Sequence, residues 1–253
     1  MAGALPGERR VELEIMGMPI VVDVRDELEP GVVDRMLAVL RDADRVFSTY
    51  REDSDVSRLN RGELELADAH PDVREVLALC DELRVITNGY FDAGRVLDRG
   101  VDPSGVVKGW AVDRAGELLE AAGARNYSLN AGGDVRLRGA PLPDSRWRVG
   151  IEHPGKRDRL AAVLEANDLA VATSGAYVRG QHVLDPHTGR PPEGVLSVTI
   201  AGPELTIADA YATAAFAMGT AGPEWTASLG LYEAMTILAD GTTLSTPGFP
   251  RVE

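Results

Sequence analysis

Residues 126–139 read NYSLNAGGDVRLRG and predict two short strands joined by a tight turn at Gly132-Gly133. As a phosphate-binding loop this glycine pair is weak, because it matches neither of the common glycine-rich phosphate motifs. More short strand candidates separated by turn residues follow, at residues 146–152, 160–167, 169–175, 182–186 and 195–202. Strands clustered between helices favour an α+β fold with mostly antiparallel sheets over a repeating parallel strand–helix–strand fold.

The segments on either side supply the helices and the outer strands. Apolar residues at helical spacing predict helices over residues 31–46, 71–87 and 206–219, and from near Val106 to a glycine cap at Gly123. Residues 11–25 predict a strand pair or a bent strand around Gly17 and Pro19, residues 47–63 predict a loop, and a short helix and two strands close the chain. The length of 253 residues fits one domain over residues 1–253.

The charge of the chain restricts the ligands it can bind. The formal net charge is −14, which argues against nucleic acid as a partner because phosphate contacts need a basic surface. An anionic ligand therefore requires a metal ion, backbone N–H groups or a few placed cations. Of the 26 basic residues only Lys108 and Lys156 are lysines, so a lysine is a rare choice in this chain.

The sequence also bears on the compartment. No stretch approaches the roughly 20 apolar residues that a membrane span requires, and the N-terminal residues lack the basic start and apolar run of a secretory signal. Cys80 is the single cysteine, so no intrachain disulfide is possible. These features predict a cytoplasmic protein, or an exported one if a leader precedes the sequence given.

The segment VDPSGVVKGW, residues 101–110, combines a tight loop with the start of a helix. Gly105 lies where the loop becomes helix, so its backbone can approach a ligand closely. Lys108 falls in the first helical turn, where the helix dipole disfavours a cation. We therefore expect Lys108 to face an anion or a carboxylate, and a solvated surface lysine is the alternative.

The segment TIADAYATAAF, residues 206–216, places Asp209 and Thr213 four residues apart on one face of a helix. A carboxylate and a hydroxyl stacked in this way supply the oxygen ligands that Mg²⁺ prefers. The alternative is a capping box, in which Thr206 and Asp209 satisfy the first backbone N–H groups of the helix. The two roles do not exclude each other.

Histidine and aromatic side chains in turn segments add further candidates. His182, close to Asp185, is a reasonable general base because imidazole titrates near neutrality, and a hydrogen-bonded structural histidine is the alternative. The other three histidines are expected at the surface. Tyr50, Tyr90 and Phe91 lie among turn residues, where a ring either stacks on a planar ligand or packs in the core.

Six segments, in this order, resemble the ApbE family, the FAD:protein FMN transferases. They are FSTYREDSDVSRLN (47–60), GYFDAG (89–94), VDPSGVVKGWAVDRAGELL (101–119), LNAGGDVRLRG (129–139), ATSGAYVRGQHVLDPHTGRP (172–191) and TIADAYATAAFAMG (206–219). The resemblance covers nearly the whole chain. It implies two intimately joined lobes with an FAD cleft between them, and an enzyme that transfers FMN from FAD to a threonine hydroxyl of an acceptor protein and releases AMP.

The resemblance also implies roles for individual residues. Mg²⁺ at the FAD pyrophosphate would be held by the main-chain carbonyl of Gly105 and by Asp209 and Thr213. His182 is the candidate base for the acceptor hydroxyl, and Lys108 helps to position the pyrophosphate charge. The flavin-contacting positions carry over to Met16, Tyr50, Tyr90, Phe91, Asp92, Asp102, Lys108 and Val183.

Two departures from the family pattern concern binding detail. The family's usual MGT reads MGM here, so Met18 replaces a threonine near the flavin, and the loop before Lys108 reads DPSGVVKG. Two alternative functions remain open: an FAD pyrophosphatase that uses water as the acceptor, and a non-catalytic flavin-binding protein. The joint presence of the metal-binding set and His182 favours catalysis, because storage of a flavin needs no base.

Overall fold

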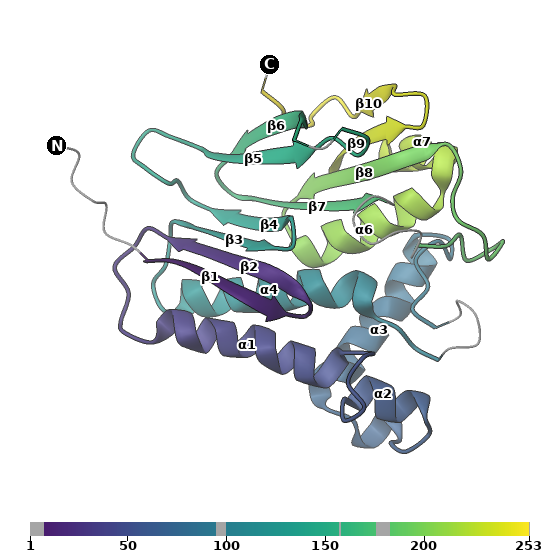
Figure 1. Cartoon of the computed structure of the whole chain (residues 1–253), viewed down its shortest axis with the longest axis horizontal. Helices are drawn as coiled ribbons and strands as arrows, with labels where there is room; N and C mark the ends of the chain where they lie inside the picture. Colours follow the sequence, from purple (N-terminus) through teal and green to yellow (C-terminus); the bar gives the residue numbers. More distant parts are fainter. Residues whose placement is uncertain (1–7, 95–99, 157, 176–182, 253) are drawn as a thin grey trace.

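The computed structural model describes residues 8–94, 100–156, 158–175 and 183–252, and it confirms the predicted α+β class (Figure 1). The strands are β1 (Glu8–Ile15), β2 (Met18–Val24), β3 (Tyr127–Ala131), β4 (Asp134–Arg138), β5 (Trp147–Glu152), β6 (Leu160–Ala166), β7 (Leu169–Gly175), β8 (Val195–Gly202), β9 (Glu233–Leu238) and β10 (Thr243–Ser245). The helices are α1 (Val32–Phe47), α2 (Asp55–Asn60), α3 (Pro71–Ile86), α4 (Ser104–Ala121), α6 (Leu205–Ala217) and α7 (Gly222–Thr226), with 3-10 turns at Leu66–Asp68 and Gly219–Ala221.

Eight of the described strands form one antiparallel sheet in the order β1-β2-β3-β4-β7-β8-β9-β10, and β5 and β6 form a separate pair. The predicted hairpin is confirmed, since Ala131 pairs with Asp134 across the turn. Gly132 and Gly133 have φ values of 60° and 103°, a left-handed backbone that other residues rarely adopt. The turn thus sets the register of β3 and β4 and places Asp134 at the first position of β4.

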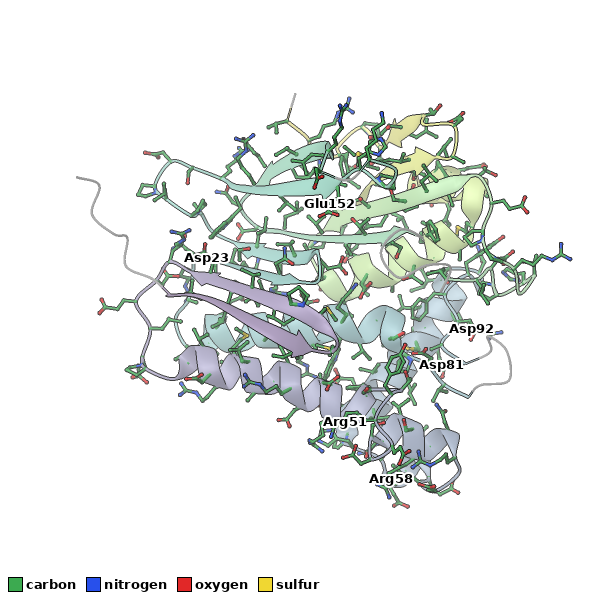
Figure 2. The ribbon with its side chains drawn as sticks, in the orientation of Figure 1. Asp23, Arg51, Arg58, Asp81, Asp92 and Glu152 are labelled. Carbon is green, nitrogen blue, oxygen red and sulfur yellow. The ribbon has the colours of Figure 1, made fainter. Side chains whose placement is uncertain are left out.

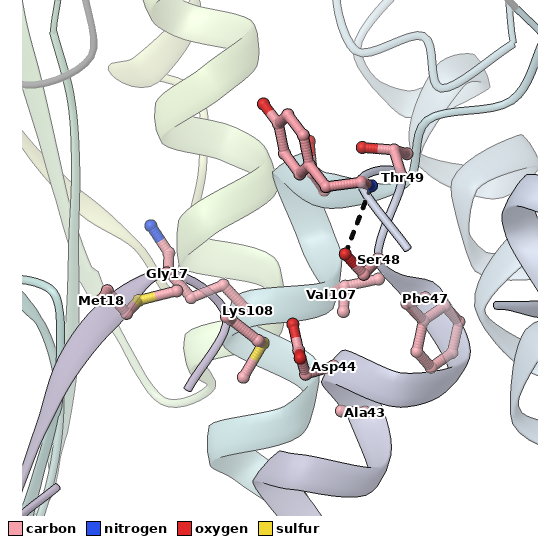
Figure 3. A pocket seen from close by; sticks show the side chains of 12 residues that line it. Gly17, Met18, Ala43, Asp44, Phe47, Ser48, Thr49, Val107 and Lys108 are labelled. Carbon is pink, nitrogen blue, oxygen red and sulfur yellow. Dashed lines mark hydrogen bonds between the residues drawn. The ribbon is translucent and has the colours of Figure 1, made fainter. Parts of the chain in front are cut away.

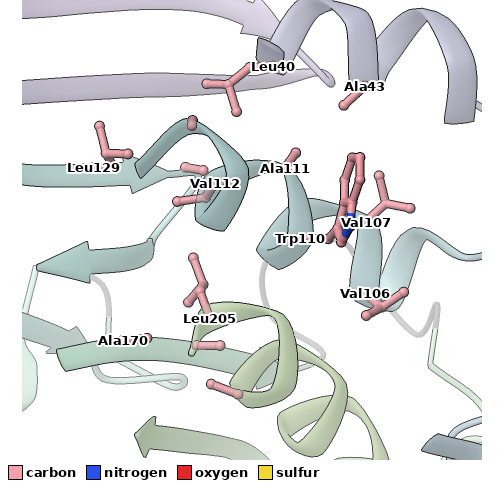
Figure 4. Close-up of a cluster of buried hydrophobic side chains, with 14 of the residues drawn as sticks. Leu40, Ala43, Val106, Val107, Trp110, Ala111, Val112, Leu129, Ala170 and Leu205 are labelled. Carbon is pink, nitrogen blue, oxygen red and sulfur yellow. The ribbon is translucent and has the colours of Figure 1, made fainter. Parts of the chain in front are cut away.

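The main core lies between the large sheet and a layer of helices in which α1 packs on α4 and α4 packs on α6 (Figure 1). Figure 4 shows the centre of this layer, where Leu40 of α1, Val112 of α4 and Leu205 of α6 lie among the buried side chains. Leu164 of β6 and Met235 of β9 belong to a second, smaller core. The main core buries apolar side chains of both the helices and the strands, and so holds α4 and α6 in fixed positions.

A buried carboxylate joins α4 to α6. Asp113 of α4 accepts hydrogen bonds from the backbone N–H groups of Leu205 and Thr206, at 3.3 Å and 2.8 Å, and from the Thr206 hydroxyl at 2.6 Å. It also forms an ion pair with Arg136 of β4. The predicted capping box of Thr206 and Asp209 is therefore wrong, because a carboxylate from another helix satisfies the first N–H groups of α6.

A glycine allows the same two helices to cross closely. A Cβ atom on Gly109 would lie 2.5 Å from the carbonyl oxygen of Leu205 and 2.8 Å from the Cα of Thr206, distances that real side chains do not adopt. Only glycine fits this crossing, and the neighbouring residue Lys108 is thereby brought within reach of α6.

Two local predictions are wrong. Residues 47–63 contain the helix α2, which follows Ser54, whose hydroxyl oxygen accepts a hydrogen bond from the Ser57 N–H at 3.0 Å. The predicted strand over residues 182–186 is not formed in its described part, since residues 183 and 184 lie in no strand and Asp185 makes only an isolated bridge to Arg190. In both places side-chain caps and turns determine the structure, which apolar periodicity does not reveal.

Charged side chains cover the periphery. Figure 2 shows Asp23 on β2, Arg51 after α1 and Glu152 at the end of β5. Among the residues that the structure describes, no helix is both long enough and apolar enough to cross a membrane.

Candidate active site

Lys108 lies near the start of α4 and is held by carboxylates from two other elements. Its ammonium forms ion pairs with Asp134 of β4 and with Asp209 of α6, the latter at 3.5 Å between Nζ and Oδ1. Only 21% of the lysine side chain is exposed. The prediction that Lys108 faces a carboxylate is confirmed, and the alternative of a solvated surface lysine is wrong. Asp134 is fixed in turn by the Thr173 N–H, which donates to Oδ1 at 3.0 Å.

Asp209 is buried at the centre of this cluster. Its Oδ2 accepts a hydrogen bond from the Gly109 N–H at 3.2 Å, across the close helix crossing. Burial raises the pKa of Asp209 well above the usual aspartate range; the ammonium of Lys108 opposes this shift and the carboxylate of Asp134 reinforces it. The charge of Asp209 is thus only partly compensated, so a further cation would stabilise it.

Thr213 lies one turn after Asp209 on the same face of α6, as predicted. A Cβ atom on Gly105 would lie 3.6 Å from the Thr213 Oγ1 and 3.1 Å from the Phe91 Cε2, so the start of α4 passes directly beside this hydroxyl. The Ser174 hydroxyl of β7 lies 3.3 Å from the Thr213 Oγ1. The structure therefore brings together Gly105, Asp209 and Thr213, the three residues predicted to bind a metal ion.

A cavity of about 500 Å³ includes Lys108 in its wall (Figure 3). It is bounded by the turn between β1 and β2, by the C-terminal end of α1 with the loop that follows, and by the start of α4. The lining residues are Met16, Gly17, Met18, Ala43, Asp44, Phe47, Ser48, Thr49, Tyr50, Ser104, Val107 and Lys108. The size and the mainly apolar wall with a few polar groups suit a small organic ligand.

Three predicted flavin contacts, Met16, Tyr50 and Lys108, line this cavity. Met16 and Gly17 form the turn between β1 and β2 with φ values of 53° and 69°, a left-handed conformation that is unusual for methionine. Tyr50 is 97% exposed, so its ring lies open to solvent at the cavity. Met18 is buried, and a Cβ atom on Gly132 would lie only 2.8 Å from its sulfur.

The aromatic pair Tyr90 and Phe91 lies outside the cavity lining. Phe91 is buried in the core, and a Cβ atom on Gly105 would lie 3.1 Å from its Cε2. Tyr90 packs edge-on against the His187 ring at a centroid distance of 4.6 Å, and the His187 Nε2 lies 3.1 Å from the Asn88 carbonyl oxygen. His187 is exposed, as expected, yet it connects the turn after Val183 to the end of α3.

The remaining predicted contacts are also absent from the cavity lining. Asp92 forms an ion pair with Arg84 at 3.1 Å. Asp102 accepts a hydrogen bond from the Ser104 N–H at 3.0 Å, which fixes the loop that leads into α4. Val183 packs against the main core and is half-buried.

Sequence reasoning missed Asp134, Asp44 and Phe47 as site residues. Asp134 directly follows the glycine turn at the start of a strand, and this position was the available signal for it. Asp44 and Phe47 are three residues apart on α1 and so share one helical face, but other polar residues of α1 gave no signal that singles out Asp44. His182 lies outside the described residues.

The comparisons with known proteins agree on one family. The family model described as ApbE family matches residues 16–96 and 94–236. An FAD:protein FMN transferase of Vibrio cholerae is 28% identical over 87% of this chain and 84% of that protein. Among solved structures, the flavin transferase ApbE from Vibrio cholerae matches with a TM-score of 0.83 at 24% identity, and the ApbE protein from Thermotoga maritima with 0.87 at 22%; each match covers 98% of this chain and 100% of the other.

Proposed function

This chain belongs to the ApbE family, and from that premise we propose that it transfers FMN from FAD to a threonine hydroxyl of an acceptor protein and releases AMP. The observation that carries the proposal is the position of the cluster of Lys108, Asp209 and Thr213, in which Asp209 is buried, next to a cavity of about 500 Å³. The cluster suits a pyrophosphate with its counter-ion, and the cavity suits a planar ring. FAD contains both parts in one molecule.

The oxygen donors of the cluster fit a magnesium ion. We assign the Asp209 carboxylate, the Thr213 hydroxyl and the main-chain carbonyl of Gly105 as its protein ligands, because Mg²⁺ binds oxygen and usually keeps several waters. The described residues contain no group of three or more His, Cys, Asp or Glu side chains that could hold a metal ion. The proposed site therefore depends on hydroxyl, carbonyl and substrate oxygens besides its one carboxylate. When bound, the ion would neutralise the pyrophosphate and polarise its oxygens.

Lys108 supplies the positive charge of the chain itself. Its ammonium is held by Asp134 and Asp209, so it is oriented before the substrate arrives. A fixed charge of this kind stabilises negative charge that develops on a phosphate oxygen as the bond to AMP breaks. The exposed ring of Tyr50 would cover one face of a bound ring system, with Met16 as a further contact. Flavin contact is proposed on the resemblance alone for five further residues: Tyr90, Phe91, Asp92, Asp102 and Val183.

The transfer step forms one bond between the acceptor threonine oxygen and the FMN phosphorus while the phosphorus–oxygen bond to AMP breaks. We assign removal of the threonine proton to His182, because a neutral imidazole accepts a proton near pH 7. Asp185 is a poor substitute, since its two carboxylate oxygens accept hydrogen bonds from the His187 N–H and the Thr188 hydroxyl, each at 2.9 Å. Its carboxylate is thus engaged in the turn that follows Val183.

Mass spectrometry tests the proposal against its two rivals. The protein is mixed with FAD, Mg²⁺ and a threonine-bearing acceptor domain of a flavoprotein, and the acceptor and the nucleotides are analysed. Addition of one FMN to the acceptor, with one AMP released, supports the transferase. Free FMN and AMP with an unmodified acceptor support an FAD pyrophosphatase, and unchanged FAD supports a binding protein. An acceptor in which the threonine is replaced by valine is the control for site-specific transfer.

A further inference from the structure

The cavity contains a carboxylate that neither the metal site nor the base uses. Asp44 lies in the last turns of α1, is half-buried and lines the cavity together with Ala43 and Phe47 of the same helix. Figure 3 shows its carboxylate directed into the space between Met18 on one side and Ser48 on the other. An acidic group in this position is unexpected in a cavity that accepts a doubly negative substrate.

The nearby cations are engaged elsewhere. Arg45 forms an ion pair with Asp42 at 3.3 Å on the outer side of α1, and Lys108 is held by Asp134 and Asp209. In the part of the chain that the structure describes, no hydrogen bond or ion pair engages the Asp44 carboxylate. Water can solvate it while the cavity is open. A ligand that displaces this water must supply a donor, because an unsatisfied charged group in a desolvated site is costly.

The charge of Asp44 decides which part of a ligand lies beside it. A carboxylate repels phosphate oxygens, so the pyrophosphate belongs on the opposite wall with Lys108, and a neutral group belongs beside Asp44. The side chains of Met16, Met18 and Val107 offer apolar surface to a flat ring, and the exposed Tyr50 ring offers a stacking face. The edge of such a ring would then face a charged hydrogen-bond acceptor.

We propose that Asp44 is a specificity-determining residue that accepts a hydrogen bond from an N–H group on the edge of one of the two ring systems of FAD. This inference rests on the proposed function. Both ring systems carry suitable chemistry: the flavin has an imide N3–H and the adenine has an exocyclic amino group. A carboxylate accepts and does not donate, so it selects a ring that presents N–H over one that presents only acceptors.

Equilibrium binding of FAD in the presence of Mg²⁺ tests the assignment. The Asp44→Ala protein should bind FAD about 10-fold more weakly or worse, the loss expected for a hydrogen bond to a charged group. Asp44→Asn keeps the shape of the side chain and should lose less than Asp44→Ala. Asp42→Ala is the matched control, since it removes a carboxylate from the same helix that is 70% exposed and lies outside the cavity. It should change the affinity less than about twofold.

Two FAD analogues identify the ring. If the flavin lies beside Asp44, the parent protein binds N3-methyl-FAD about 10-fold more weakly than FAD, and Asp44→Ala binds the two equally. If the adenine lies there, the same pattern appears with the analogue that carries unsubstituted purine in place of adenine, because purine lacks the exocyclic amino group and has only acceptor nitrogens on that edge.

Equal FAD affinity of Asp44→Ala and the parent protein would overturn the assignment. It would also be overturned if, for each analogue, the ratio of FAD affinity to analogue affinity were the same in the two proteins. If the parent protein itself fails to bind FAD, the proposed function fails, and this outcome is distinct from the failure of Asp44.

Discussion

The two walls of the candidate site are built in opposite ways. At the crossing of α4 and α6, Lys108 and Asp209 are fixed by ion pairs, by the Gly109 N–H and by a helix contact that only glycine permits. At the end of α1 and in the loop that follows, Tyr50 is almost fully exposed and the Asp44 carboxylate has no hydrogen-bond or ion-pair partner among the described residues. The buried wall is complete before a substrate arrives, whereas the open wall obtains its contacts from the substrate. We infer that the first fixes phosphate chemistry and the second fixes ring recognition.

The largest effect is expected from the centre of the buried wall. Asp209→Asn keeps the side-chain shape and an oxygen that can accept the Gly109 hydrogen bond, but removes the charge that would bind Mg²⁺. The rate of FAD cleavage should fall more than about 100-fold, since loss of even an outer partner of a metal ligand costs about 10- to 100-fold. Initial rates over a range of Mg²⁺ concentrations, with thermal unfolding alongside, measure this effect. A protein that merely melts earlier and cleaves FAD at the normal rate would show that Asp209 has only a structural role.

Two threonines of α6 separate structure from chemistry within one helix. Thr213→Val removes a proposed metal ligand and should raise the Mg²⁺ concentration for half-maximal rate about 10-fold or more, with little change in stability. Thr206→Val removes the hydroxyl that donates to Asp113 at 2.6 Å, and should lower the free energy of unfolding by about 1–3 kcal/mol without changing the Mg²⁺ requirement. Urea unfolding and Mg²⁺ titration of both proteins check this contrast. If both variants show the same pair of changes, the division between cap and metal site is incorrect.

The smallest effect should come from the open wall. Tyr50→Ala should weaken FAD binding by about 10-fold, the lower range for loss of one aromatic stacking contact, while Tyr50→Phe should bind normally. Stability should not change, because the side chain is 97% exposed. Leu231→Ala is the control, since Leu231 is 79% exposed and lies outside the cavity lining. Equal FAD affinity for Tyr50→Ala and the Leu231 control, measured by flavin fluorescence, would remove Tyr50 from the site.

The sequence predicted the local parts of the site better than its long-range contacts. The expected position of Lys108 in a first helical turn predicted a carboxylate partner. The partner is present, although the predicted helix start near Val106 is wrong, since α4 begins at Ser104 and Lys108 is its fifth residue. The spacing of Asp209 and Thr213 predicted a shared face. The identity of the partners depends on tertiary structure, since Asp134 and Asp209 lie on a strand and a helix far along the chain. The same limit explains the incorrect capping box at Thr206, because the true cap, Asp113, lies 93 residues earlier.

The open wall was harder to predict because turn segments do not determine burial. Tyr50 and Phe91 both lie near turn residues, yet one ring is almost fully exposed and the other is 3% exposed. The helix α2 was missed because its six residues are mostly polar and its start depends on the Ser54 hydroxyl. By contrast, the strand pair at Gly132-Gly133 and the helices α1 and α3 follow directly from alternating or helical spacing of apolar residues.

One diffraction measurement tests most directly whether one wall binds the metal and the other binds a ring. It records the anomalous signal from crystals that contain FAD and Mn²⁺ in place of Mg²⁺. We predict an anomalous peak within about 2.5 Å of an Asp209 carboxylate oxygen, the Thr213 hydroxyl and the Gly105 carbonyl, with an FAD ring against Tyr50. A peak elsewhere, or a pyrophosphate bound with no metal beside Asp209, would contradict the account.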